Sequence, residues 1–369
     1  MFVFKHGCRN ASRTVARRFD RRCASRIAIP METPPFPVVE HCPSPTCQCR
    51  ETPQGLDIER ETNLNGSIAS YAEQVLISTG RMDWKSRIEE EEEGVLVRQL
   101  KAYLGRGGKY SDPFHNVMLT NSSFHPTQPL AHQTEATGTP IPTGKASPFS
   151  SISNNQSASS HETPTASAFL LPSFQYIPAI PTDPASIEAF IQAFILPSQL
   201  HQSHDSLTRE QKNVLRRQPE RQKSFVGARK ADEILVLICG HGGRDSRCGT
   251  LGPLLKAEFE DKLRRQNIPL LDEPPVAEAV EVETEVEGYT PTARVGLISH
   301  IGGHKWAGNV IVYIPPSFKA NALAGKGIWY SRVGPEHVEG IVEKTVVEGK
   351  VIKELFRGGI DQERTMLRV

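Results

Sequence analysis

The sequence predicts a mixed α/β (α+β) protein whose clearest part is at its C-terminus. From residue 231 onward, short apolar runs of strand length alternate with stretches in which apolar residues recur at helical spacing. Residues 124–167 are instead rich in Ser, Thr, Pro and Asn, with hardly a charge, so we expect a disordered insertion there. The length of 369 residues exceeds one average domain, which favours a smaller N-terminal α/β region beside the C-terminal domain.

The composition argues against several classes of protein. Apolar residues make up 38% of the chain and charged residues 23%, so compact cores can form. A formal net charge of +1 gives no overall basic field, and we expect no nucleic-acid partner. No apolar run approaches the roughly 20 residues that cross a bilayer, so we expect no membrane span. The seven cysteines are scattered and odd in number, which favours a metal site or working thiols over a disulfide scaffold.

Residues 1–30 have the composition of a mitochondrial presequence. Asp20 is their one acid, phenylalanines and aliphatic residues are interspersed, and the basic residues are Lys5, Arg9, Arg13, Arg17, Arg18, Arg21, Arg22 and Arg26. An Arg-rich, acid-poor, amphipathic leader of this kind directs proteins to mitochondria, whereas a secretory signal needs a continuous apolar core. We therefore expect residence in the mitochondrial matrix or intermembrane space. The alternative is a disordered basic tail that binds anionic surfaces.

The N-terminal region is predicted to comprise residues 31–123 plus 168–200. Its first part is rich in proline, which favours extended chain or turns. Apolar residues at helical spacing then predict a helix around Ser67–Thr79. The acidic run Glu89–Glu93 suits a solvated helix face or a helix N-terminus. Further on, Ala168–Ile177 is strand-like and Ser186–Leu196 predicts an apolar helix, while residues 201–230 form a polar linker or an exposed helix.

The C-terminal domain, residues 231–369, opens with a strand over Glu233–Ile238 and a glycine-rich loop over Gly240–Gly249. A helix over Leu251–Gln266 follows, with Thr250 as its N-cap and Pro253 in its first turn. The later elements are an acidic surface insertion or exposed strand at 278–287, strands at Arg294–Ser299, Asn309–Ile314 and Gly327–Arg332, and a last helix after Gly334-Pro335. The resulting order, β-α-β-β-β-α, resembles a thioredoxin-like arrangement.

Two glycine-rich segments in this domain carry a candidate ligand set. Cys239 and Cys248 are spaced C-x8-C, and His300 and His304 are spaced H-x3-H. Cys239 and His300 each end a predicted strand, so the two loops can face each other at one sheet edge. Glycine lets backbone N–H groups approach a bulky inorganic core, and a helix N-terminus stabilises thiolate and sulfide charge.

Four interpretations of this set are open from spacing alone. A structural zinc site with two Cys and two His ligands is one, although zinc fingers usually pair cysteines at C-x2–4-C. A 2Fe–2S cluster also accepts two cysteines and two histidines, and the wide first loop favours something larger than one ion. Mononuclear iron or copper is the third. In the last, Cys239 and Cys248 form a redox dithiol and the histidines are structural.

Three more cysteines, Cys42, Cys47 and Cys49, lie in the proline-rich segment and are candidate redox thiols. They could equally serve a second metal site or be ordinary thiols. In the C-terminal loops, His241 is expected to be a loop residue. Lys305, Trp306 and Asn309 could contribute hydrogen bonds around the ligands, since outer groups orient metal-binding side chains.

The segments around the ligand set resemble the fungal sucrase/ferredoxin-like family. The resemblance rests on C-G-H-G-G-R-D-S-R-C-G-T-L-G-P-L, S-H-I-G-G-H-K-W-A-G-N-V-I-V-Y and G-I-W-Y-S-R-V-G-P-E-H-V, and on C-P-x-P-x-C-x-C, Gly80–Trp84 and Leu171–Phe174. It implies a thioredoxin-like ferredoxin domain that holds a 2Fe–2S cluster through Cys239, Cys248, His300 and His304. It also implies mitochondrial residence and a redox role in thiol quality control.

Two functions follow as expectations. In the first, the chain is an electron-transfer protein that exchanges electrons with a redox partner the sequence does not identify. In the second, it is a thiol-disulfide regulator whose metal centre, zinc or a cluster, is structural or a sensor. The residues favour an electron carrier over an enzyme that turns over a substrate, because no constellation of catalytic acid and base residues is apparent.

Overall fold

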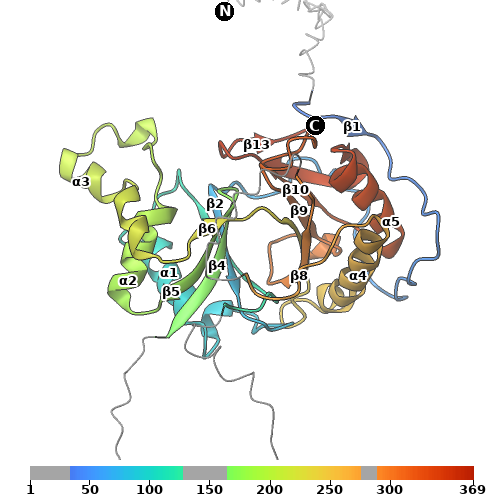
Figure 1. The fold of residues 1–369 in the computed structure, drawn as a ribbon, viewed down its shortest axis with the longest axis horizontal. Helices are drawn as coiled ribbons and strands as arrows, with labels where there is room; N and C mark the ends of the chain where they lie inside the picture. The colour runs from blue at the N-terminus through green and yellow to red at the C-terminus, as the bar shows by residue number, and fades with distance from the viewer. Residues whose placement is uncertain (1–33, 128–163, 276–288) are drawn as a thin grey trace, which may run out of the picture. The chain divides into compact units, whose positions relative to one another are not determined.

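The computed structural model describes residues 34–127, 164–275 and 289–369. The predicted presequence, residues 128–163 of the predicted insertion and the acidic segment 278–287 lie outside the described residues. Within the described part, the mixed α/β class is confirmed (Figure 1). No helix among these residues combines the length and the apolar character needed to cross a membrane.

One sheet of eleven strands runs through the described residues, with helices packed against its faces (Figure 1). The strands follow the order β13-β12-β10-β9-β7-β8-β3-β2-β4-β5-β6. Their bounds are β2 Glu73–Ser78, β3 Val117–Ser122, β4 Thr165–Leu171, β5 Gln175–Pro181, β6 Arg229–Lys230, β7 Ile234–Cys239, β8 Ala293–Ile298, β9 Val310–Ile314, β10 Lys326–Tyr330, β12 Phe356–Ile360 and β13 Met366–Leu367. A second, two-stranded parallel sheet pairs β1 (Val38–Val39) with β11 (Val351–Ile352).

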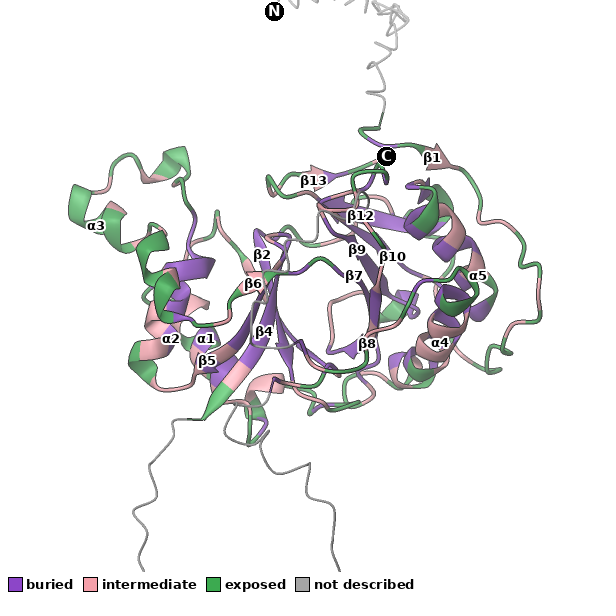
Figure 2. Ribbon diagram, in the orientation of Figure 1, coloured by how far each residue is buried: buried purple, intermediate pink, exposed green. Residues whose placement is uncertain are grey.

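The C-terminal part begins with the predicted order β-α-β-β-β-α, but the helix predicted to be the last is followed by three strands, β11, β12 and β13, which were not predicted. It runs β7, α4 (Ser246–Arg265), β8, β9, β10 and α5 (Pro335–Ile341), and a π-helical turn, Val342–Val347, extends α5. Strand β7 is parallel to β8 and antiparallel to β9, which is antiparallel to β10. Strand β7 is buried along its whole length because helix α4 covers one of its faces and the sheet continues on both sides (Figure 2).

The N-terminal part contributes β2 to β6. Helix α1 (Val95–Leu104), helix α2 (Pro184–Phe190) and the π-helical turn Ile191–Ile195 pack their apolar sides against these strands. The two parts meet where Ser122 of β3 pairs with Ile298 of β8. The segment predicted as a linker or exposed helix contains the short helix α3 (Arg209–Val214), whose residues include none that are buried. The two predicted regions therefore share one sheet.

Two element predictions are wrong. The predicted helix Ser67–Thr79 is instead extended chain that leads into strand β2. All six residues of β2 are buried, between β3 and β4, so strand pairing on both sides overrides the helical spacing of its apolar residues. Helix α4 begins at Ser246, and its N-cap is Asp245, which accepts a hydrogen bond from the Arg247 N–H at 3.1 Å. Cys248 therefore lies in the first turn of α4 and not in a loop.

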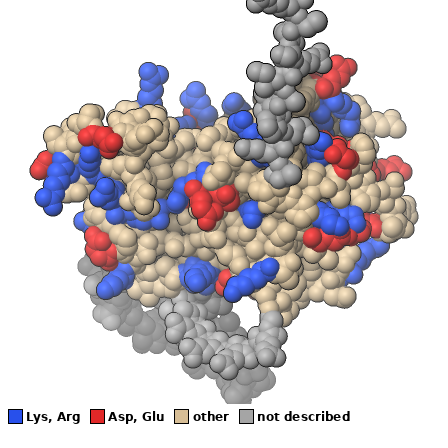
Figure 3. Space-filling model, turned by 90° about the horizontal axis from the view of Figure 1, so that it is seen from above, with Lys and Arg blue, Asp and Glu red and all other residues tan. Residues whose placement is uncertain are grey.

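The remaining differences are refinements. The strand-like stretch Ala168–Ile177 comprises the end of β4, a three-residue turn and the start of β5, which together form a hairpin. The acidic run lies just before α1, as a helix N-terminus would require, with a short 3-10 turn over Ile88–Glu90. On the face drawn in Figure 3, basic and acidic side chains are interspersed, in keeping with the near-neutral net charge of +1.

A partly buried histidine in the N-terminal part makes stability depend on pH. His115 Nε2 lies 2.7 Å from the carbonyl oxygen of Ile195, so the neutral ring donates to it. Burial lowers the pKa of His115 to about 4 from an ordinary 6.5, and Arg364 and Arg217 act in the same direction. Because the unfolded chain takes up this proton first, the folded state loses stability as the pH falls from about 6.5 to about 4.

We expect the His115→Gln variant, which keeps a donor but cannot titrate, to lose less stability on acidification. Between neutral pH and about pH 4, wild type should lose about 2–3 kcal/mol more of its unfolding free energy than the variant does. Urea unfolding monitored by fluorescence at a series of pH values measures this difference. Parallel pH profiles for the two proteins would contradict it.

Candidate metal centre

The four predicted ligands come from two loops at one edge of the sheet. Cys239 is the last residue of β7, and it pairs with Ile298, the last residue of β8. His300 follows two residues after Ile298. Because β7 and β8 are parallel, their C-terminal ends lie side by side, and the loops that follow them share this edge. The structure thus places Cys239 and His300 together, as the sequence predicted.

The two cysteines contact each other. Both are buried, Cys239 with 1% and Cys248 with 0% of its surface exposed. A hydrogen bond from Cys248 lowers the pKa of Cys239 well below its ordinary value, and His300 adds to this effect while burial opposes it. The same hydrogen bond, with burial, raises the pKa of Cys248. Cys239 is therefore the more acidic thiol of the pair.

The two histidines form the outer half of the site. The rings of His300 and His304 lie 5.4 Å apart, centroid to centroid, and are tilted by 40°. His300 is half-buried and within hydrogen-bonding reach of Cys239, whereas His304 is exposed and begins a 3-10 turn, His304–Trp306. Within the described residues, no three His, Cys, Asp or Glu side chains converge as the ligands of a single ion do. The donors instead form two neighbouring pairs.

Close backbone packing fixes the cysteine loop. A Cβ atom on Gly249 would lie 2.6 Å from the Cα atom of Gly242, and a Cβ atom on Gly252 would lie 2.6 Å from the Cα atom of Gly240. Helix α4 can therefore approach the loop closely only because these positions are glycine. From the N-terminal part, Asp83 accepts hydrogen bonds from the Gly243 N–H at 3.0 and 3.1 Å. The N-terminal part thus helps to shape the loop.

His241, which the sequence analysis treated as a loop residue, connects three segments. Its Nδ1 accepts a hydrogen bond from the His300 N–H at 2.9 Å. Its Nε2 lies 3.1 Å from the carbonyl oxygen of Trp84 and 3.0 Å from that of Lys85, so Nε2 carries the proton and donates. This single side chain ties the cysteine loop to the histidine loop and to the N-terminal part. Its position beside Cys239 was the only sequence signal.

We expect the His241→Phe variant to be less stable by about 2–3 kcal/mol, because it leaves a buried carbonyl group at Trp84 and a half-buried N–H at His300 without partners. Urea unfolding of the purified protein measures the change. His41→Phe is the matched control, since His41 is exposed, and it should change stability by less than about 0.5 kcal/mol. If the His241→Phe variant were as stable as the His41→Phe variant, the hydrogen bonds of His241 would contribute nothing to the unfolding free energy.

A buried arginine, not identified from the sequence, lies beneath the histidine loop. The guanidinium of Arg357, on β12, donates to Asn309 Oδ1 at 2.8 Å and to the carbonyl oxygens of Gly302 at 3.2 Å and Ser67 at 3.1 Å. Its side chain also lies against the rings of Trp306 and Trp329. Among the described residues, no carboxylate forms an ion pair with it.

Burial lowers the pKa of Arg357 to about 10, and the nearby negative charge of Cys239 partly offsets this effect. The guanidinium is only 2% exposed, so at neutral pH it is a buried positive charge facing the thiolate side of the site. Asn309, one of the residues predicted to lie around the ligands, connects Arg357 to the histidine loop. Its Nδ2 donates to the carbonyl oxygen of Gly303 at 3.1 Å. Trp306 is largely buried, whereas Lys305 is exposed.

A cleft of about 710 Å³ opens beside the site. Its lining includes His300, His241 and Arg244 from the site, and Arg87 and Lys101 from the N-terminal part. The three candidate thiols Cys42, Cys47 and Cys49 lie elsewhere, on the segment that crosses helices α4 and α5. Burial and nearby carboxylates raise the pKa of Cys42 to about 12. The structure thus separates these thiols from the predicted ligand set.

The profile of the sucrase/ferredoxin-like family matches residues 64–358, which include all four predicted ligands as well as Asp83, His241 and Arg357. The chain belongs to this family. The matched residues include strands β2 to β10 and the first half of β12, so most of the sheet that joins the two parts lies within the matched segment. Cys42, Cys47 and Cys49 precede the matched segment.

Several curated relatives of the chain are named altered inheritance of mitochondria protein 32. The relative from Debaryomyces hansenii is 28% identical over 87% of this chain and 96% of its own length. Those from Meyerozyma guilliermondii and Clavispora lusitaniae are 33% and 38% identical over 47% of this chain. In these two alignments the chain spans about half the length of the relative, 51% and 52%. No solved structure matches the chain.

Proposed function

We propose that this chain is a mitochondrial redox protein in which Cys239, Cys248, His300 and His304 hold a 2Fe–2S cluster. The observation that carries the proposal is the arrangement of donors as a buried cysteine pair beside an outer histidine pair. In a Rieske centre, two cysteines bind one iron and two histidines bind the other, so two pairs suit a two-iron cluster better than a single ion. The donor types fit the group, since thiolates and imidazoles are the ligands that such clusters use.

The surroundings of the site favour a negatively charged group. Cys248 lies in the first turn of α4, where the helix N-terminus stabilises negative charge. Arg357 brings a buried positive charge toward Cys239 without an ion-pair partner among the described residues. Asn309 joins Arg357 to the histidine loop. Together these groups hold the ligand loops in place and offset the charge of the thiolates.

The unequal burial of the two pairs suits electron transfer. When bound, a 2Fe–2S cluster supplies one-electron redox chemistry. The chain keeps water from the cysteines, which are buried, and presents His304 to the solvent. Three basic residues, Arg87, Lys101 and Arg244, line the adjacent cleft against one acidic residue, Glu89, which pairs with Lys101. We therefore expect the redox partner to present an acidic surface near His300. The Arg-rich leader and the names of the relatives support a mitochondrial setting.

Anaerobic purification followed by iron and sulfide analysis tests this proposal. We expect about two irons and two acid-labile sulfides per chain, and an EPR signal on one-electron reduction. The His304→Cys variant should keep the cluster at a lower potential, because a thiolate adds negative charge where an imidazole was neutral. A colourless protein that contains stoichiometric zinc would overturn the cluster assignment.

The contact between Cys239 and Cys248 favours a second function, thiol-disulfide exchange. A lowered pKa marks Cys239 as the attacking thiolate, and Cys248 would resolve a mixed disulfide. The burial of both sulfurs opposes this role, because a client disulfide would have to reach Cys239 through the loop. Substituting Cys248 with alanine and searching for trapped mixed disulfides decides between the two: their absence removes the exchange function.

A further inference from the structure

The N-terminal strap, defined as residues 34–63, crosses the helices of the C-terminal part. Its Val38 pairs with Val351, and its Arg50 forms ion pairs with Glu258 and Asp261 of α4 at 2.7 and 2.6 Å. Further along, the Glu59 N–H donates to the carbonyl oxygen of Lys305 at 2.9 Å. The strap therefore connects the outer side of α4 and α5 with the histidine loop.

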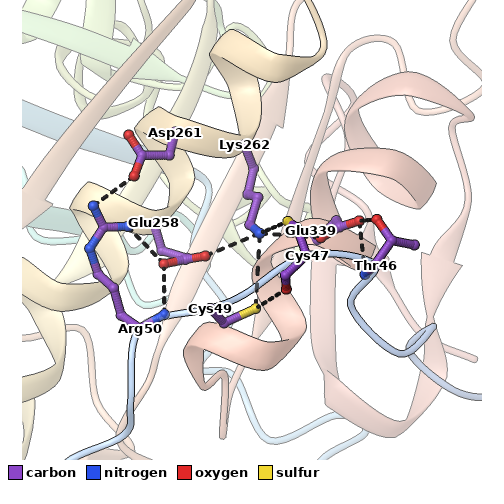
Figure 4. Close-up of polar contacts among 8 residues, drawn as sticks. All are labelled: Thr46, Cys47, Cys49, Arg50, Glu258, Asp261, Lys262 and Glu339. Carbon is purple, nitrogen blue, oxygen red and sulfur yellow. Dashed lines mark hydrogen bonds and ion pairs between the residues drawn. The ribbon is translucent and has the colours of Figure 1, made fainter.

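A cysteine and a lysine meet where the strap passes between the two helices (Figure 4). Lys262 Nζ, on α4, lies 2.7 Å from Cys47 Sγ and 3.9 Å from Cys49 Sγ. Sulfur is larger than oxygen, so 2.7 Å, which is at the short end of the range for N–H···O bonds, is close for an N–H···S contact. The two atoms are near enough for one bridging oxygen atom to join them.

Two carboxylates hold Lys262 in this position. Its ammonium lies 3.2 Å from Glu339 Oε2 and 3.3 Å from Glu258 Oε1, and only 3% of the residue is exposed. With Cys47, these groups engage all three of its N–H donors. Glu339 Oε2 also accepts from Cys47 Sγ at 3.0 Å, so one carboxylate orients both the nitrogen and the sulfur.

We propose that Cys47 and Lys262 form a reversible covalent cross-link, S–O–N, with dioxygen as the oxidant. The thiol and the ammonium combine with one dioxygen molecule to give the bridge, one water molecule and one proton released to solvent. The sulfur and the nitrogen each lose two electrons, and dioxygen gains four. One of its oxygen atoms becomes the bridge and the other leaves as water. Cys47 is half-buried, so dissolved oxygen can reach it, and oxidation beyond a free thiol is an ordinary fate of such cysteines.

The cross-link acts as a redox-dependent clamp on the strap. In the reduced protein the strap is held to α4 by hydrogen bonds and by partly exposed ion pairs, each of which contributes little. In the oxidised protein a covalent bond fixes it to the helix whose first turn contains Cys248. This inference concerns a second site and stands independently of the proposed cluster.

Mass spectrometry of the full chain, purified in air without reductant, tests the clamp. We expect an intact mass higher by one oxygen atom and lower by two hydrogen atoms, and tandem spectra that join the Cys47 and Lys262 peptides. Treatment with excess dithiothreitol should abolish both signals. Cys47→Ser and Lys262→Arg should lose the cross-link to background, whereas Cys49→Ser and Lys256→Arg, a control on the same helix, should retain it.

A second measurement needs no variant. Alkylation of the denatured, unreduced wild-type chain should leave Cys47 unlabelled while Cys49 is labelled. A species that lacks two hydrogen atoms, carries no added oxygen and disappears in Cys49→Ser would instead be a Cys47–Cys49 disulfide, and it would overturn the proposal. An unchanged mass with full labelling of Cys47 would overturn it as well. Neither measurement involves iron, so the proposed cross-link and the proposed cluster are tested independently of each other.

Discussion

If the proposed cluster is present, the Cys248→Ser variant will lose the iron and the visible absorption that the cluster gives, while it keeps its fold. Cys248 lies in the first turn of α4, and serine can keep the hydrogen bond there that the thiol makes. A hydroxyl is a poor ligand for iron, however, and changes even to outer groups cost roughly 10–100-fold in metal affinity. We therefore expect iron per chain to fall by more than about tenfold, measured by elemental analysis after anaerobic purification.

The control for this experiment is Cys49→Ser, a substitution of the same kind in the strap. Its iron content and absorption should equal those of wild type, because Cys49 contacts Lys262 and not the ligand set. Circular dichroism of both variants establishes that they are folded. Unchanged iron in Cys248→Ser would remove Cys248 from the ligand set and, with it, the cluster proposal.

The Arg357→Gln variant will lose about 3 kcal/mol of unfolding free energy. The guanidinium donates to the backbone carbonyl oxygens of Gly302 and Ser67 and to the side-chain oxygen of Asn309. A shorter, neutral side chain cannot reach all three. The acceptor of Asn309 is buried and those of Gly302 and Ser67 are partly buried. A buried acceptor left without a donor costs about 1–3 kcal/mol, and the removal of one buried charge partly offsets the total. Urea unfolding at neutral pH measures the loss.

The proposed cluster should have a lower potential in the same variant, because the positive charge near Cys239 is gone. The potential separates an electrostatic role for Arg357 from a purely structural one, since destabilisation alone would not shift it in a defined direction. Arg265→Gln, at the end of α4, is the matched control and should change stability by less than about 0.5 kcal/mol. A variant as stable as wild type, with an unchanged potential, would show that Arg357 supports neither the loop nor the site.

The helix N-terminus at α4 shows where local rules misled. Thr250 is a good N-cap residue, and the prediction placed the start of the helix there. Asp245 caps it instead, because the side chain of Asp245 also pairs with Arg247, which in turn donates to the carbonyl oxygen of Asp57 in the strap at 2.8 Å. Asp is at least as good an N-cap residue as Thr, so the local pattern allowed both starts. The hydrogen bond from Arg247 to Asp57, 190 residues away, is a contact that no local pattern contains.

Strand β2 shows the same limit. Its apolar residues recur at a spacing that suits a helix, but β3 and β4 flank it and bury every side chain. A strand buried on both faces has no polar face to reveal a two-residue period, so the sequence pattern could not distinguish it from a buried helix.

By itself, the sequence determined the mixed α/β class, the order of elements from β7 to α5 and the choice of four candidate ligands, because each of these depends on residue type and spacing within one segment. It did not predict the strands β11, β12 and β13 that follow α5. Only the tertiary structure decided what surrounds those ligands. It brought Asp83 to the cysteine loop, His241 to the histidine loop, Arg357 beneath both, and Lys262 to Cys47. These partners are far apart in the chain. Hydrogen bonds between distant segments produce no periodic pattern or local composition from which they could be predicted.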